Sequence, residues 1–321
     1  MFVQDIDSTA LPRDRSSGVG WVHANFVLLA AALTISVLQL FIAPLIFPID
    51  AWTVFAIVAL CAVSTPMHWG LMHESIHGNL LADPSANRRA GRLLGVLLCL
   101  SWDVMRFGHL LHHSANRHAF DRPEAVPPGG SRISTAGPYY LKLLGGHAVI
   151  SSTSVIALAL PLPIAVWLIE KIASGAEYAT MRSAAIRALT NAGRQRRIRF
   201  DLFAMCTLLA LASCCWRAHW PALAASIAAR HLALSLLDNA PHYGTALDSG
   251  TNARNTSLPR WVSWIVLEQN FHGIHHGSPG LRWNDLRQAF ERSARSYDGN
   301  WLASVLRQFR GPLVFGSRVR R

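Results

Sequence analysis

Residues 51 to 79 read AWTVFAIVALCAVSTPMHWGLMHESIHGN, a stretch with no charged residue between Asp50 and Glu74 that ends in the pattern H-E-x-x-H. An uncharged run of this length can cross a membrane as one helix. Two histidines four residues apart, here His73 and His77, share one face of a helix and can bind the same metal ion. In zinc peptidases with this pattern the glutamate activates water, so such a peptidase is one interpretation.

The composition is typical of a membrane protein. Of 321 residues, 51% are hydrophobic and only 15% are charged, whereas soluble domains carry about 25% charged residues. The chain is also uncharged from Ser16 to Ile49, and we therefore expect two spans, at 22–47 and 51–70. The first 20 residues contain Arg13 and Arg15 but no apolar core, which predicts no cleavable signal peptide.

Further apolar runs cover 143–169, 202–216 and 221–237. Two prolines interrupt the first run, which predicts a broken or re-entrant helix, and the other two runs predict a tight hairpin. The run 93–102 separates two histidine motifs that must lie on the same side to share a metal, so we expect a half-embedded or membrane-surface helix there. The sequence predicts an all-α integral membrane helical bundle with about four full spans plus re-entrant or interfacial helices.

The charge distribution indicates an orientation. The chain has 30 basic and 18 acidic residues, a net charge of +12, and the segment 171–200 is strongly basic. Basic loops of membrane proteins face the cytoplasm, although a docking face for acidic lipids or an acidic protein remains open. No nucleic-acid-binding motif accompanies the basic residues, so we expect no nucleic-acid partner.

The histidines form a constellation too large for a single zinc ion, which needs three or four ligands. The sequence contains 15 histidines, and nine of them fall in short motifs. Imidazole binds iron, zinc, copper and nickel, and we favour two iron ions because a nitrogen-rich site beside an apolar chamber suits the activation of dioxygen. The candidate ligands are His73, His77, His109, His112, His113, His242, His272, His275 and His276.

The order of these motifs, each beside a membrane segment, resembles the histidine boxes of the membrane fatty acid desaturase superfamily. That superfamily also includes carotenoid ketolases and sterol and alkane hydroxylases. The resemblance runs from about residue 50 to 290 and includes supporting stretches at 238–244 and 252–256. The matching boxes are His73 to His77, His109 to His113, and Asn270 to His276 followed by Pro279.

The resemblance implies a non-haem diiron enzyme whose boxes form a cytoplasmic cap. The eight box histidines would be iron ligands, and His242 would match an additional ligand. Here the spacing departs from N-x-x-x-H, because Asp238 rather than Asn239 lies four residues before His242. Whether His242, Asp238 or a bridging water completes the shell stays open.

Several other residues are candidates for supporting roles. Side chains that hold the metal ligands in place are expected at Glu74, Asn116, Asp121, Asp238, Asn239 and Asn270. Trp261, Trp264 and Arg254 are candidates for substrate contact, although the tryptophans could be interfacial anchors and Arg254 a structural loop contact. No covalent nucleophile is expected.

The predicted activity is O2-dependent introduction of a C=C bond into a fatty acyl chain linked to a lipid, CoA or acyl carrier protein. The alternatives are a related hydroxylase, ketolase or acetylenase, and a zinc peptidase that would leave six box histidines unused. Electrons are expected from a separate ferredoxin, rubredoxin or cytochrome with its reductase. The expected organisation is a cytoplasmic N-terminal tail (1–20), a membrane desaturase domain (21–296) and a basic C-terminal tail (297–321).

Overall fold

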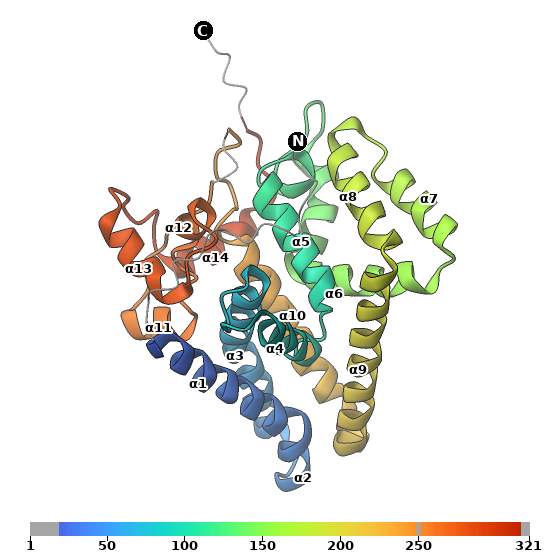
Figure 1. The fold of residues 1–321 in the computed structure, drawn as a ribbon, viewed down its shortest axis with the longest axis vertical. Coiled ribbons are helices and arrows are strands. Elements are labelled where there is room, and N and C mark those ends of the chain that lie inside the picture. Colours follow the sequence, from blue (N-terminus) through green and yellow to red (C-terminus); the bar gives the residue numbers. More distant parts are fainter. Residues whose placement is uncertain (1–18, 249–251, 316–321) are drawn as a thin grey trace.

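The computed structural model describes residues 19–248 and 252–315, and within these ranges every extended regular element is a helix (Figure 1). The predicted all-α class is therefore confirmed. The expected N-terminal tail, except for its last two residues, and the final six residues of the expected C-terminal tail lie outside the described residues.

The first two long helices pack side by side. Helix α1 (Val19–Val37) continues through a π-helical turn, η1 (Leu38–Ile42), into α2 (Ala43–Ile46), and α3 covers Ala51–His77. The expected span 51–70 is thus the first part of a helix that runs unbroken through the first histidine box. Helix α3 ends there because Gly78 has a φ of +76°, a left-handed conformation that glycine adopts without strain.

The next two helices form a sharp bend. Helices α4 (Pro84–Leu97) and α5 (Trp102–Ala115) meet at 103°, so the expectation of one helix over 93–102 was wrong. Cys99 has a φ of +56°, and the Leu100 N–H returns to the Gly95 carbonyl at 2.8 Å. A Cβ on Gly95 would lie 2.6 Å from the Leu100 carbonyl oxygen, so glycine makes this tight reversal possible.

The middle of the chain contains the predicted broken helix. Helix α6 (Arg132–Ala159) is kinked at Gly145, and α7 (Leu162–Ile172) begins directly after Pro161. A short turn, η3 (Ala176–Tyr178), then leads to α8 (Ala179–Thr190). The break near Pro161 agrees with the effect of proline on helices, whereas the kink at Gly145 was not expected.

The predicted hairpin is present. Helix α9 (Ala192–Trp216) ends in a 3-10 turn, η4 (Arg217–His219), and α10 (Trp220–Asn239) runs back from it (Figure 1). Helix α10 packs mainly against α3 and α6. Among the described residues, three helical stretches are long and apolar enough to cross a membrane: Trp21–Ile46, Ala51–His77 and Ala192–Asn239, the last of which includes both helices of the hairpin. The count rises to four if the bent pair α4–α5 is taken as one span.

Large apolar side chains on the outside of these stretches agree with a lipid surrounding. On α3, Trp52 is 80% exposed and Val63 is 75% exposed, while Met72 and Ile76 near the end of the helix are buried. A soluble protein rarely exposes so much contiguous apolar surface. These side chains agree with a membrane protein, and α3 passes from a region that exposes large apolar side chains into a buried one.

Short helices at the C-terminal end cover the buried end of α3. They are α11 (Arg260–Ile265), α12 (His272–Gly277), α13 (Trp283–Arg292) and α14 (Trp301–Arg307), followed by η5 (Gln308–Arg310). The chain after α14 lies against α6, where the Tyr139 hydroxyl donates to the Gln308 carbonyl at 2.7 Å.

The loop before α11 braces α12, which carries the third histidine box. The Asn255 Oδ1 accepts the Ile274 N–H at 3.0 Å. A Cβ on Gly273 would lie 2.6 Å from the Ala253 carbonyl oxygen. Only a glycine at this position lets α12 approach the loop so closely.

We expect Gly273→Ala to destabilise the protein by about 1–3 kcal/mol, because the added methyl group would force α12 away from the loop that contains Ala253. The matched control is Gly277→Ala at the other end of α12, where a Cβ meets no atom within 4 Å. The measurement is the thermal unfolding midpoint of the detergent-solubilised protein. Equal midpoints for the two variants would contradict the close packing of Gly273.

Candidate metal centre

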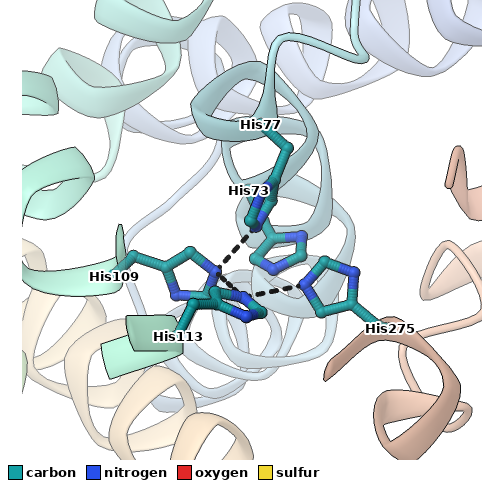
Figure 2. Close-up of side chains that lie close together, drawn as sticks. All are labelled: His73, His77, His109, His113 and His275. Atoms are coloured by element: carbon teal, nitrogen blue, oxygen red, sulfur yellow. Dashed lines mark hydrogen bonds between the residues drawn. The ribbon is translucent and has the colours of Figure 1, made fainter. Parts of the chain in front are cut away.

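Nine buried or half-buried histidines converge in two adjacent clusters, and they are the nine that the sequence motifs singled out. Within each cluster, the candidate ligand atoms all lie within 4.8 Å of one another. The five-histidine cluster contains His73, His77, His109, His113 and His275 (Figure 2), and the four-histidine cluster contains His112, His242, His272 and His276.

The helical period explains how the boxes divide. His73 and His77, in the last turns of α3, enter the same cluster because residues four apart share a helix face. Adjacent residues point about 100° apart on a helix, so His112 and His113 of α5 enter different clusters, as do His275 and His276 of α12. Each H-x-x-H-H box therefore serves both clusters.

In the five-histidine cluster the Nε2 atoms face one another. The Nε2 of His109 lies 2.9 Å from that of His77 and 3.0 Å from that of His113, which in turn lies 3.1 Å from that of His275 (Figure 2). The Nε2 of His73 is buried and has no hydrogen-bond partner among the described residues. An orphaned ring nitrogen at this place is a candidate metal-binding atom.

The four-histidine cluster has the same pattern. The Nε2 of His242, in the turn after α10, lies 3.0 Å from that of His272 and 3.2 Å from that of His112. The Nε2 of His276 lies 3.2 Å from that of His272 and 3.3 Å from that of His112. The structure thus places His242 in the cluster and leaves Asp238 outside it.

These distances fit metal coordination. Two nitrogens that each lie about 2.1 Å from one ion are about 3.0 Å apart at a right angle and about 3.4 Å apart at a tetrahedral angle. Burial lowers the pKa of His242, His275 and His276 well below 6.5 and that of His272 to about 3. These imidazoles are therefore neutral at physiological pH, which is the form that binds metals.

The second ring nitrogen of several histidines has a polar neighbour. The Asp121 Oδ2 lies 2.7 Å from the His112 Nδ1, and the Asn252 carbonyl oxygen lies 3.3 Å from the His242 Nδ1. The Asn116 amide lies 3.4 Å from the His276 Nδ1. The carboxylate and the carbonyl can accept the Nδ1 proton of His112 and of His242, which leaves the Nε2 lone pair of each ring directed at the cluster. The Asn116 NH2 group is a donor and does not favour that tautomer of His276.

Glu74 is buried at the edge of the centre. Its Oε2 accepts the Trp283 N–H at 3.2 Å, and its Oε1 lies 3.8 Å from the His73 Nδ1. The carboxylate therefore connects α3 to α13 beside a cluster histidine.

Three other predicted supporting residues contact groups outside the two histidine clusters. The Asn239 amide donates to the Gln308 Oε1 at 2.7 Å, and the Asn270 amide donates to the Thr256 carbonyl at 2.8 Å. The Asp238 Oδ2 lies 3.5 Å from the Nε2 of His147 on α6. In these contacts the side chains brace loops and helices around the centre.

Of the three candidate substrate residues, the two tryptophans are exposed and Arg254 is half-buried. Trp261 is 70% exposed and Trp264 is 43% exposed, both on α11. Arg254 donates to the Tyr243 carbonyl in the turn that contains His242, a contact that agrees with the structural interpretation of this residue.

Sequence reasoning missed two features of the site. The Gln269 amide lies 3.4 Å from the His73 Nδ1. In the sequence, this role of Gln269 was indicated only by its position directly before Asn270 of the third box. On α10 and in the turn after it, the spacing of His231, Ser235, Asp238 and His242 puts polar groups on one side, where the Ser235 hydroxyl accepts the His147 N–H at 3.4 Å. This spacing was visible in the sequence.

Comparison with protein families gives one result that covers most of the chain. The family model described as fatty acid desaturase matches residues 50–309. A search of curated proteins gives no match. The matched range includes both clusters and the helices that carry them, and it agrees with the resemblance of the three boxes. The chain therefore belongs to the fatty acid desaturase family.

Proposed function

We propose that this protein is a membrane-bound non-haem diiron desaturase that uses O2 and external electrons to introduce a C=C bond into a fatty acyl chain. The observation that carries the proposal is the division of nine histidines into two adjacent clusters, each with enough nitrogens for one ion. Membership of the desaturase family supports the same chemistry.

The five-histidine cluster would hold one iron and the four-histidine cluster the other. Bound iron would supply the activation of dioxygen that removal of hydrogen from an unactivated methylene requires. The protein's own part is to present neutral imidazoles and to hold them in place. Asp121 holds His112, the Asn252 carbonyl holds His242, and the buried surroundings of α12 limit the access of water.

The number of histidines in the cluster argues against the zinc-peptidase alternative. The Oε2 of Glu74 accepts the Trp283 backbone N–H, whereas its Oε1 has no hydrogen-bond partner among the described residues, so the contacts of Glu74 alone do not separate the two functions. The two histidines beside Glu74 share their cluster with three others, which a single catalytic zinc does not require.

We further propose four full spans, α1 to α2, α3, α9 and α10, with the metal centre on the cytoplasmic side. The basic residues between α7 and the apolar part of α9 support this orientation through the positive-inside rule. The electron donor would be a separate ferredoxin, rubredoxin or cytochrome with its reductase, and the acyl chain would be linked to a lipid, CoA or acyl carrier protein.

Elemental mass spectrometry of the protein purified without added metal should find about two irons per chain, one for each cluster. Its absorption spectrum should lack the Soret band of haem. His275→Ala should lower the iron content because it removes a ligand that faces His113. His219→Ala, on the exposed turn after α9, is the matched control. One zinc per chain, unaffected by His275→Ala and lost in His73→Ala, would contradict the diiron proposal.

We expect Asp121→Ala to weaken iron binding about 10- to 100-fold, because the His112 ring loses the carboxylate that orients it. The measurement is the iron retained during titration with a chelator. Glu291→Gln removes an exposed carboxylate on α13 and is the control. Equal retention by the two variants would show that Asp121 does not support the centre.

Membrane vesicles given O2 and a reduced ferredoxin, rubredoxin or cytochrome system should form acyl chains with two fewer hydrogens, as read by mass spectrometry of the lipids. His276→Ala should form none. Only inside-out vesicles, which expose the cytoplasmic face, should be active with a soluble donor. Products that gain an oxygen would identify a hydroxylase instead, and activity confined to right-side-out vesicles would overturn the orientation.

A further inference from the structure

Helix α11 carries an exposed apolar face. Trp261 is 70% exposed, Trp264 is 43% exposed and Ile265 is 40% exposed. A spacing of three and four residues places side chains on one side of a helix, so these three form a single surface, the α11 face. Ser263 between them is buried, so the other side of α11 packs against the protein. The α11 face therefore takes its surroundings from outside the described fold.

Helix α13 links α11 to the beginning of α1. The Trp264 ring lies edge-on to the ring of Trp283 on α13, with 5.8 Å between the ring centroids. The Trp283 indole N–H donates to the Asn25 Oδ1 at 2.8 Å. Asn25 lies about 6 Å along the helix from the first residue of the apolar stretch Trp21–Ile46. The α11 face is thus held near the first turns of this stretch (Figure 1).

A second contact fixes the same level. The Arg282 guanidinium, directly before α13, lies 4.3 Å from the centroid of the Trp21 ring. On α1, large exposed apolar side chains begin at this height, where Phe26 is 54% exposed and Val27 is 61% exposed. If α1 crosses a membrane, its first turns lie where the headgroups meet the acyl chains, and α11 lies beside them.

The residues of α11 suit that boundary. An indole ring is apolar over most of its surface and has one N–H donor, and tryptophan is therefore enriched where headgroups meet acyl chains. Arg260, directly before Trp261, is exposed, and its guanidinium suits the phosphates of a lipid surface. A soluble partner or a second copy would have to reach α11 beside the entry point of α1, where the bilayer surface already lies.

We propose that α11 is an interfacial anchor, with the α11 face in the headgroup boundary of the leaflet that α1 enters at Trp21 and with Arg260 toward the lipid phosphates. This inference rests on the proposed crossing of α1 and not on the proposed chemistry of the metal centre.

The anchor has a direct connection to the third histidine box. The Glu268 N–H donates to the Ser263 carbonyl at 2.7 Å, which folds the chain back tightly after α11. The next residue, Gln269, contacts His73, and His272 follows three residues later. Because so few residues separate α11 from this box, the anchor sets the height of the box above the membrane surface.

The test is covalent labelling of the full chain reconstituted into lipid nanodiscs, read residue by residue with peptide mass spectrometry. One probe is a phospholipid that carries a photoactivated diazirine in the first part of its acyl chain, and the other is hydroxyl radical generated in the water. Trp261, Trp264 and Ile265 should be labelled by the lipid and largely spared by the radical. Trp283, which is buried, should be modified by neither probe.

Oxidation of the α11 face without lipid labelling would show that it faces water or a soluble partner. Modification by neither probe would show that a second copy or the path of the substrate covers it. Either result overturns the proposal. Trp52, 80% exposed on α3, should be labelled by the lipid in every case. Loss of its labelling as well would overturn the proposed spans, so the two failures are distinguishable. Neither readout depends on iron or on enzymatic activity.

A pair of variants at one position tests the apolar contact itself. Trp261→Gln should lower the lipid labelling of Trp264 and Ile265 several-fold, because an amide side chain replaces the largest apolar group of the α11 face. Trp261→Phe is the matched control, since it keeps an apolar ring at the same place, and it should retain most of the labelling. Equal labelling in the two variants would contradict an anchor that depends on Trp261.

Discussion

Nine buried or half-buried imidazoles, eight of which have their Nε2 atom 2.9 to 3.3 Å from that of another, are the constraint on which the rest of this structure depends. Neutral imidazoles in this arrangement direct lone pairs at the same point, and protonated ones would repel each other in surroundings of low polarity. A cation in each cluster removes both problems. Most other features around the centre serve to bring these rings together and to keep them there.

Four segments bring the rings together, and each uses a different local device. Gly78 ends α3 directly after His77, and the bend between α4 and α5 aims α5 at the end of α3. The turn after Asn239 adds His242, and the close approach of Gly273 to Ala253 seats α12. The candidate ligand atoms of each cluster lie within 4.8 Å of one another. The backbone conformation of each connecting segment is therefore tightly restricted.

The sequence predicted the parts of this arrangement that follow from local periodicity. Spans, boxes and the hairpin depend on hydrophobic runs and on the helical repeat. The eight box histidines were found from their spacing, and His242 was added by the resemblance to the desaturase family. The bend between α4 and α5 was missed, because an apolar run does not reveal a reversal made by a left-handed Cys99 over Gly95. The contact of Gln269 with His73 joins residues 196 positions apart, and no local pattern encodes it.

At the same bend, a buried side chain supplies a hydrogen bond to backbone that leaves the regular helical pattern. Arg230, buried in the middle of α10, donates to the Leu97 carbonyl at 2.6 Å and to the Gln39 side chain at 2.9 Å. Its charge lies at the C-terminal end of α4, where the helix dipole is negative. A carbonyl without a partner here would cost free energy comparable to a lost hydrogen bond. Arg230 on one side of the bend and the Asp103–Arg197 pair on the other therefore fix where α5 begins, and the start of α5 sets the positions of His109, His112 and His113 in the two clusters.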